Sequence, residues 1–238
     1  MEVAEAGGDA EVRGLDRAAE LAAGVRHFSK SVDRQQTAIA DALVSCLAVH
    51  GLAKTTVDDI ARAAGCSRAT VYRVFPGGKD EMLSVAVELE ASRLLEGVAA
   101  RMDEKQGLEE ALAAGVLEAA ARLRRHPALE FMLLHEPGPI LTLLAFGEMD
   151  VLLESVKVQL SPVLGRWLRM EGAERISELA TRMVLSYMAC PASDMELSDP
   201  GKVQEMVQLF LLPAARQFAR ESREPRGAEH ARHEEGTG

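Results

Sequence analysis

Residues 55–79, with the sequence TTVDDIARAAGCSRATVYRVFPGGK, constrain the fold more than any other stretch of this chain. Thr56 is followed three residues later by Asp59, which is typical of a capped helix start where a side-chain oxygen accepts a backbone N–H. Gly65 follows the apolar edge of this helix, and glycine adopts the positive φ of a tight turn without strain. Ser67 can cap a second helix that ends before a Pro-Gly-Gly sequence. Two short helices joined by such a turn predict a helix-turn-helix.

The second of these helices, about residues 67–75, has two different faces. Val71, Val74 and Phe75 recur at helical spacing and should point inward. The other sides carry short, hydrogen-bonding and cationic side chains, which suit a helix that enters the major groove of DNA. An ordinary helical hairpin with a solvated face would show the same pattern, so these residues alone leave both readings open. The outward set is Arg68, Ala69, Thr70, Tyr72 and Arg73.

The stretch from about residue 33 to residue 83 resembles the DNA-binding region of the TetR (tetracycline-repressor) family of bacterial transcription regulators. The matching segments are T-T-V-D-D-I-A-R-A-A-G-C-S-R-A-T-V-Y-R-V-F and then G-K-D-E-M-L. Val74 stands where an aromatic residue or His is common in the family, and two glycines precede Lys79 where many members have a shorter link. The resemblance implies that residues 67–75 form the recognition helix, that Thr56 and Lys79 contact backbone phosphates, and that Tyr72 touches the DNA backbone or a base. The DNA-binding residues predicted in this way are Thr56, Ser67, Arg68, Ala69, Thr70, Tyr72, Arg73 and Lys79.

The charge of the chain is unevenly distributed. The formal net charge is −10, which at first sight argues against a nucleic-acid partner. Residues 26–82, however, hold eight Lys or Arg and six Asp or Glu, so this region is slightly basic and the acidic excess lies elsewhere. Such asymmetry fits a DNA-binding end on an acidic body, with affinity set by the placement of a few cations.

Composition and periodicity predict an all-α fold with two domains. The 238 residues are 47% hydrophobic but only 4% aromatic, so the core is built from Leu, Ala, Val and Met, which favour helices over sheet. We expect a disordered acidic extension over 1–30, a helix-turn-helix domain over 31–83, a helical ligand-binding and dimerisation domain over 84–220, and a disordered tail over 221–238. The expected helices outside the helix-turn-helix cover about 32–50, 79–102, 108–125, 128–135, 148–170, 173–189 and 200–220.

The sequence argues against an enzyme, a metal site and a membrane span. It contains no G-x-S-x-G, G-x-G-x-x-G, Walker A or H-E-x-x-H motif, so no catalytic residue and no cofactor are predicted. Three scattered cysteines have no paired spacing, which argues against zinc and disulfides and suits the reducing cytoplasm. The start of the chain lacks the basic character of a signal peptide, and no uncharged apolar run reaches about 18 residues.

A ligand site is expected in the second domain, around a Pro-Gly-Pro break at 137–139. The break prevents the apolar stretch 129–153 from packing as one regular helix, and its Met and Leu side chains suit an adaptable apolar cavity. A solid core would use the same residues, and for most of them that is the simpler interpretation. The predicted effector is a largely apolar small molecule, with polar contacts from Thr142, His135 or Tyr187. The predicted ligand-binding residues are Phe131, Met132, His135, Leu141, Leu144, Met149, Leu152, Trp167, Met183 and Tyr187.

The last predicted helix, over 200–220, is apolar nearly all round in its middle. A helix that is apolar on most faces is buried on most faces, so either a partner chain or the rest of its own subunit must cover it. We favour a homodimer, which the family resemblance also implies. The predicted dimerisation residues are Met183, Val203, Val207, Phe210 and Ala214.

The sequence thus predicts a homodimeric transcription regulator, in this family most often a repressor, that binds double-stranded DNA at a pseudo-palindromic operator. An apolar effector would act through the helix that joins the two domains. The alternative is a small-molecule-binding or scaffold protein whose helix-turn-helix no longer binds DNA.

Overall fold

A computed structural model of the chain describes residues 34–138, 149–192 and 194–219. Within these ranges the fold is all-α, as predicted, and two isolated antiparallel residue pairs are its nearest approach to strand structure. The elements are α2 (Arg34–Lys54), α3 (Val57–Ala63), α4 (Arg68–Val74), α5 (Gly78–Asp103), α6 (Leu108–Arg124), α7 (Pro127–His135), α9 (Met149–Leu164), α10 (Met170–Ala189), α11 (Pro200–Met206), a π-helical turn η1 (Val207–Leu211) and α12 (Leu212–Arg216). The predicted extension 1–30 and tail 221–238 lie outside the described residues.

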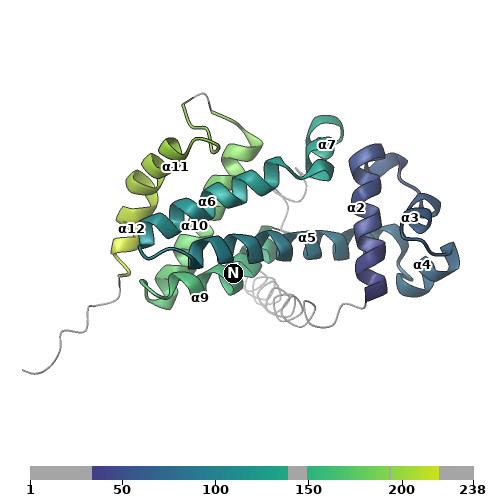
Figure 1. Cartoon of the computed structure of the whole chain (residues 1–238), viewed down its shortest axis with the longest axis horizontal. Helices are drawn as coiled ribbons and strands as arrows, with labels where there is room; N and C mark the ends of the chain where they lie inside the picture. Colours follow the sequence, from purple (N-terminus) through teal and green to yellow (C-terminus); the bar gives the residue numbers. More distant parts are fainter. Residues whose placement is uncertain (1–33, 139–148, 193, 220–238) are drawn as a thin grey trace, which may run out of the picture.

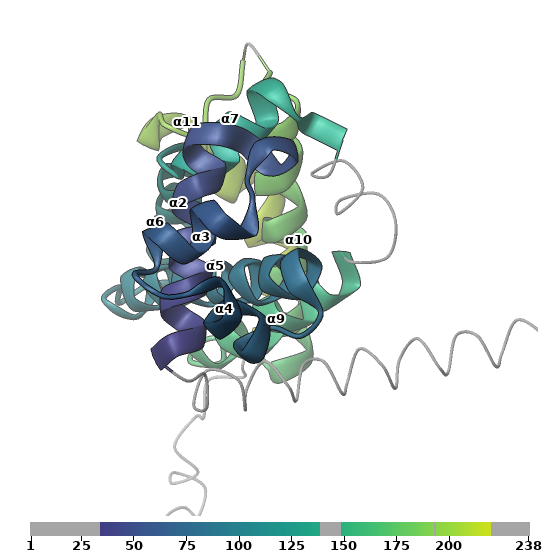
Figure 2. The ribbon, with the colours of Figure 1, turned by 90° about the vertical axis from the view of Figure 1, so that its right-hand side faces the viewer.

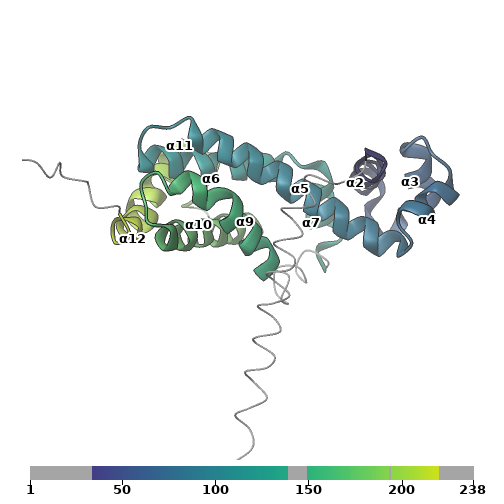
Figure 3. The same ribbon diagram turned by 90° about the horizontal axis from the view of Figure 1, so that it is seen from below.

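The described helices form an elongated molecule with two hydrophobic cores. The N-terminal core joins α2, α3 and α4 to the first part of α5, and Ala128 of α7 also belongs to it. The C-terminal core joins the second part of α5 to α6, α9, α10 and the final helices. Figures 1 and 3 show α5 running from α2 and α4 at one end of the molecule into the helices of the other. Leu89 is the last α5 residue packed on the first core, and Leu95 is the first in the second.

Local capping signals explain where several helices begin. The side chain of Thr56 accepts the N–H of Asp59, and the Asp59 carboxylate accepts the N–H of Thr56, so both halves of a capping box are present at α3. Ser67 caps α4, as predicted. Asp199 caps α11 ahead of Pro200, which the sequence also indicates. His126 does more than end α6: its ring nitrogen accepts the N–H of Leu129 and so caps α7.

Two helices predicted in the C-terminal half differ from the observed ones. The helix expected over 148–170 ends at Leu164, two residues after Pro162, and α10 begins at Met170 instead of residue 173. The sequence prediction allowed Pro162 either to kink this helix or to divide it into two, and the structure shows two helices, α9 and α10. Pro162 itself lies inside α9, where it has no N–H to donate to the preceding turn.

The helix expected over 200–220 is also divided. Its buried residues Val203, Val207, Leu211 and Ala215 recur every four residues. In a regular α-helix, residues four apart drift by roughly 40° per step, and a π turn, which has more residues per turn, offsets part of this drift. Pro213 contributes to the irregularity, because it has no N–H to donate to the preceding turn.

Helix α2 has the length and mean hydropathy, 1.3 over its most apolar window, of a membrane-spanning helix. Its apolar face is packed instead: Ile39, Leu43 and Leu47 lie in the N-terminal core. Among the described residues no other helix meets these criteria of length and apolarity. The apolar character of α2 therefore reflects its contacts with α3, α4, α5 and α7.

Candidate DNA-binding surface

Helices α3 and α4 lie together at the end of the molecule that faces the viewer in Figure 2. Both helices pack against α2 and α5 through three completely buried side chains. These are Ile60 of α3, Val71 of α4 and Phe75, the residue after α4. Gly65 in the turn between them has φ 66°, and a Cβ there would meet no atom within 4 Å. The turn therefore requires a left-handed backbone at Gly65, but the described residues leave space for a side chain there.

The outward face of α4 agrees with the sequence prediction. Arg68, Ala69, Tyr72 and Arg73 are exposed, and Thr70 is half-buried. The Arg68 guanidinium lies 5.6 Å from the centre of the Tyr72 ring. Figure 3 shows that α4 lies at one end of the elongated molecule. A short helix that presents two guanidinium groups and a phenol is suited to contacts with phosphates and base edges.

The two arginines of α4 have exposed partners within the subunit. Arg68 Nη1 lies 3.2 Å from Asp58 Oδ2, and both side chains are 58% exposed. Arg73 Nη2 donates to Gln35 Oε1 at 3.1 Å. The hydrogen bond with Tyr72, and then the nearby Asp58 carboxylate, raise the pKa of Arg68, so its charge is permanent. Exposed ion pairs of this kind contribute roughly 0–1 kcal/mol, so a DNA phosphate can replace these partners at little cost.

Thr56 and Ser67 act first as structural caps. Thr56 Oγ1 donates to Asp59 Oδ2 at 2.6 Å and accepts the Asp59 N–H at 3.2 Å. These hydrogen bonds from Thr56 lower the pKa of Asp59. Ser67 Oγ accepts the Thr70 N–H at 3.1 Å and lies 2.9 Å from Thr70 Oγ1. A phosphate that binds Thr56 must therefore compete with Asp59 for the hydroxyl proton.

Lys79, for which the family resemblance implied a phosphate contact, has backbone partners within the subunit. Its Nζ donates to the carbonyl oxygens of Leu52 and, at 2.9 Å, of Thr55. Leu52 lies in the last turn of α2 and Thr55 directly follows α2, and both hydrogen bonds are half-buried. The two glycines before Lys79 lead directly into α5, so the ammonium group is directed back to the end of α2. In this structure Lys79 is a structural contact within its own domain.

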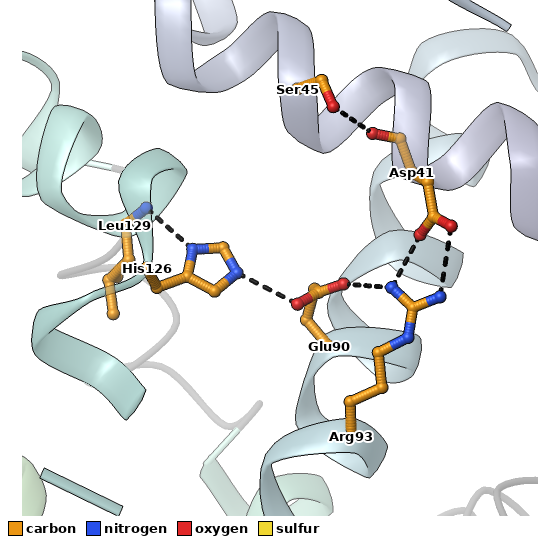
Figure 4. Close-up of polar contacts among 6 residues, drawn as sticks. All are labelled: Asp41, Ser45, Glu90, Arg93, His126 and Leu129. Carbon is orange, nitrogen blue, oxygen red and sulfur yellow. Dashed lines mark hydrogen bonds and ion pairs between the residues drawn. The ribbon is translucent and has the colours of Figure 1, made fainter. Parts of the chain in front are cut away.

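Four charged or titratable side chains connect α2, α5 and the start of α7 (Figure 4). Arg93 of α5 donates from Nη1 and Nη2 to the two carboxylate oxygens of Asp41 on α2, at 2.6 and 3.2 Å. Arg93 Nη1 also donates to Glu90 Oε1 at 2.6 Å. Glu90 Oε2 lies 3.1 Å from His126 Nε2, whose ring accepts the Leu129 N–H through Nδ1 at 3.2 Å. The neutral imidazole with its proton on Nε2 satisfies both bonds at once.

This network predicts an acid-sensitive contribution from Glu90. The hydrogen bond from His126, assisted by Arg93, lowers the pKa of Glu90 against the opposing effect of burial. The resulting stabilisation is present above the unfolded pKa of Glu, about 4.3, and is lost as the pH falls through the lower folded pKa. Glu90→Gln should lower the free energy of unfolding by about 1 kcal/mol at pH 7 and by less at pH 3.5, measured by urea denaturation.

Glu88→Gln is the matched control on the same helix. Burial raises the pKa of Glu88, and among the described residues no hydrogen bond or ion pair offsets this effect. Removing this charge should therefore leave the protein equally or more stable at pH 7. If both variants were destabilised equally at pH 7, the proposed network would not be what distinguishes Glu90.

Local sequence patterns did not identify Asp41, Arg93 or Glu136 as contact residues. Asp41 and Arg93 are 52 residues apart, and Glu136 is 84 residues from Leu52, whose N–H it accepts. Each has many alternative partners of opposite charge in the sequence, so no local pattern could select these pairs.

The predicted ligand-binding residues do not form one cluster. Phe131, Met132 and His135 lie on α7, which packs against α2, and the Phe131 ring stacks on His135 with centroids 4.4 Å apart. For these three the structure shows a helix–helix contact with the N-terminal domain, because the chain turns at His126 and sends α7 towards α2. Leu141, Thr142 and Leu144 lie outside the described residues. Leu152, Trp167, Met183 and Tyr187 are half-buried against the C-terminal core, and Met149 is half-buried at the start of α9.

A cleft of about 540 Å³ lies elsewhere in the C-terminal half. Its wall is the outer side of α6, with the end of α5 and the segment before α11. It shares no residue with the predicted ligand-binding set. Its lining mixes charged and small side chains: Arg101, Lys105, Glu109, Glu110, Ala113, Ala114, Leu117, Glu118, Ala121, Arg124, Leu197, Ser198 and Gln204.

The predicted dimerisation residues are divided between the core and the surface. Val203 and Val207 are 0% exposed and are enclosed by their own subunit, so the prediction that they face a partner chain is wrong. Met183 and Ala214 are half-buried. Phe210 is 52% exposed, and its neighbour Leu209 is 60% exposed. One side of this helix is covered within the subunit, and the side that carries Leu209 and Phe210 is exposed.

Comparisons with known proteins agree with this geometry. Residues 39–86 match the family model described as "Bacterial regulatory proteins, tetR family". A comparison with curated protein sequences found no match. Among solved structures, the chain is similar to the TetR family repressor AlkX from Dietzia sp. strain DQ12-45-1b, which is implicated in n-alkane biodegradation. The TM-score is 0.61 and the sequence identity is 20%, and the match covers 77% of this chain and 96% of AlkX.

Two further structures show the same fold. The fatty acid degradation regulator FadR from Bacillus halodurans has a TM-score of 0.52 and 20% identity, and a TetR-family regulator from Streptomyces coelicolor has 0.52 and 23%. Each covers 74% of this chain and 96% of its own. The matched segment contains α3, α4 and most of α2, and the neighbours share the helical body behind it. Residues 39–86 therefore form a DNA-binding region of the TetR type, and the described chain shares the fold of TetR-family structures.

Proposed function

We propose that this regulator is a repressor that binds a pseudo-palindromic operator as a homodimer and is released by an apolar small molecule. The single observation that supports DNA binding is that α4 has two different faces. Val71 is fully buried on one face, and the other exposes Arg68, Tyr72 and Arg73 at the end of the molecule. Two such helices must lie about 34–36 Å apart to reach successive turns of the major groove, which requires a dimer with twofold symmetry.

The test is footprinting on genomic DNA, followed by gel shifts on the protected fragment. Protection of an inverted repeat, with one protein dimer per site, would support the proposal. Failure to protect any fragment, with the parent folded and dimeric, would favour a scaffold protein whose helix-turn-helix no longer binds DNA.

The dimer is proposed to form through the exposed side of η1. Leu209 and Phe210 are adjacent, large and apolar, and α10 contributes the exposed Leu179. Val203 and Val207 are buried in the core of their own subunit, so they fix the position of the helix that carries this surface. An exposed apolar surface of this kind marks an interaction site more often than scattered single residues do.

Phe210→Asp is expected to weaken dimerisation at least about tenfold while leaving the subunit folded, because it places a charge in a surface that must become dry. Sedimentation velocity across a range of concentrations measures this. Leu134→Asp is the control, since Leu134 is 71% exposed on α7, away from this helix. A dimer of unchanged strength in the Phe210 variant would place the interface elsewhere.

The effector site is proposed to involve Leu152 of α9, Trp167, and Met183 and Tyr187 of α10. All four are half-buried apolar or aromatic side chains that border the C-terminal core. Two proteins of the same fold, AlkX and FadR, are described in connection with n-alkane biodegradation and fatty acid degradation, which agrees with an apolar effector.

Trp167 is the single tryptophan of the chain, so its fluorescence reports directly on this site. Titration with long-chain alkyl compounds and fatty acids should change the emission, raise Tm, and weaken operator binding by about 5- to 150-fold. Tyr187→Ala should reduce the response, whereas Leu117→Ala, in the cleft beside α6, should not. No change in emission or Tm across the panel would indicate that these residues form solid core.

A further inference from the structure

Residues 51–55, which comprise the last turn of α2 after its break at Gly51 and the residue that follows α2, are held from two sides by side chains of opposite charge. On one side, the carboxylate of Glu136 accepts the Leu52 N–H at 2.7 Å and the Ala53 N–H at 3.3 and 3.4 Å. On the other, the ammonium group of Lys79 donates to the carbonyl oxygens of Leu52 and Thr55. Lys79 belongs to the N-terminal domain, whereas Glu136 directly follows α7. We call residues 51–55 the hinge segment.

The carboxylate of Glu136 satisfies a need that the backbone creates at Gly51. This glycine has φ 75° and ψ 175°, which interrupts the helix of α2. The N–H groups that follow the interruption lose their helical acceptors, and a carboxylate with two oxygens can accept both. The contact is therefore a cap supplied from a distant part of the chain.

Gly51 itself is closely packed against the end of α7. A Cβ built on Gly51 would lie 2.6 Å from Glu136 Oε1 and 2.7 Å from Phe131 Cε1. Phe131 is held in turn by its stacking on His135. The end of α7 thus rests on the hinge segment through one charged and one aromatic side chain, and the absence of a side chain at Gly51 makes room for both.

The hinge segment leads directly into the helix-turn-helix. Thr55 Oγ1 donates to the Gly51 carbonyl at 2.6 Å, and Thr56, the next residue, caps α3. A displacement of α7 would withdraw the Glu136 carboxylate and free two N–H groups immediately before this cap. Because α7 is joined to α6 through Arg125 and His126, its position depends on the C-terminal domain.

We propose that Glu136 is a positioning residue through which the C-terminal domain fixes the orientation of the helix-turn-helix, by capping the hinge segment. This inference rests on the proposed function, and it adds a second connection between the domains beside the continuous helix α5. It requires no contact of Glu136 with DNA, so its effect is on the geometry of binding and not on the attraction of phosphates.

The test compares Glu136→Ala with Glu130→Ala, a matched control that removes an exposed carboxylate from the same helix without a hydrogen-bond partner in the described residues. Glu136→Gln keeps one acceptor oxygen and should behave between the parent and the alanine variant. Amide exchange of Leu52 and Ala53, followed by NMR, should be at least about tenfold faster in Glu136→Ala and unchanged in Glu130→Ala.

The second readout is DNA binding by the same full-length variants. Operator affinity should fall about tenfold in Glu136→Ala, whereas affinity for a random duplex of equal length should stay within about twofold, because the phosphate-binding arginines are untouched. General unfolding would lower both affinities together. Unchanged exchange at Leu52 and Ala53, or unchanged operator affinity, would overturn the proposal. If the parent protein binds no operator, the proposed function fails, but the exchange experiment still tests the capping role. Faster exchange of Leu52 and Ala53 in Glu136→Ala would then support that role, and unchanged exchange would overturn it.

Discussion

The double variant Arg68→Ala/Arg73→Ala is expected to bind the operator about 1,000-fold more weakly than the parent at equal salt concentration. It removes four cationic contacts from the dimer, and each contact with a phosphate or base edge is worth about 1 kcal/mol or more, with 1.4 kcal/mol for each factor of ten. Because both side chains are exposed and Val71 still anchors α4, the fold should be unaffected. Gel shifts and circular dichroism measure the two effects.

The salt dependence of binding provides an independent check. If all four arginines neutralise phosphates, the parent should show a log–log slope of roughly −4, and the double variant should lose most of it. Lys79→Met should leave this slope unchanged, because Lys79 is bonded to backbone carbonyls. The matched control Arg101→Ala/Arg122→Ala removes equal charge from exposed ion pairs in the C-terminal half. An equal loss of affinity in this control would show that bulk charge, and not the α4 surface, determines binding.

Gly51→Ala is expected to lower the free energy of unfolding by about 3–5 kcal/mol. The backbone at Gly51 lies in a region that only glycine enters easily, which costs about 1–3 kcal/mol for another residue, and the added methyl group would collide with Glu136 and Phe131, which costs a similar amount. Urea denaturation of the full chain measures this loss.

Gly65→Ala is the matched comparison, because Gly65 also has a positive φ but faces open space. It should cost only about 1 kcal/mol, the strain of the left-handed backbone. Equal costs at the two positions would show that the contact of α7 with Gly51 contributes little. A further variant, Gly51→Ala/Glu136→Ala, should recover part of the loss, since one of the colliding groups is then removed.

The local features of the helix-turn-helix could be predicted from the sequence because each depends on residues within one or two turns. Thr56 and Asp59 are three residues apart and form the predicted capping box. Val71 and Phe75 are four apart and both are buried, as the helical period indicates. Asp199 and Pro200 likewise start α11 where expected. Interactions of this range are nearly independent of the rest of the fold.

The hydrogen-bond partners of Lys79 could not be predicted from its neighbours in the sequence. The family resemblance implied a phosphate contact, but the ammonium group can reach any acceptor within the length of a flexible side chain. The structure brings the carbonyls of Leu52 and Thr55 within that length, and two bonds that already exist in the free protein take precedence. The choice depends on distances of a few ångströms between segments 24 and 27 residues apart.

The sequence by itself determined the all-α class, the helix-turn-helix and its outward face, since these follow from helical period, caps and glycine positions. Only the tertiary structure decided which elements meet: α7 packs on α2, Glu136 caps the hinge segment, and Val203 and Val207 are covered by their own subunit. Hydrophobic burial is non-directional, so an apolar helix face shows that something must cover it without identifying the partner. That partner is fixed by packing and by hydrogen bonds between residues far apart in the chain.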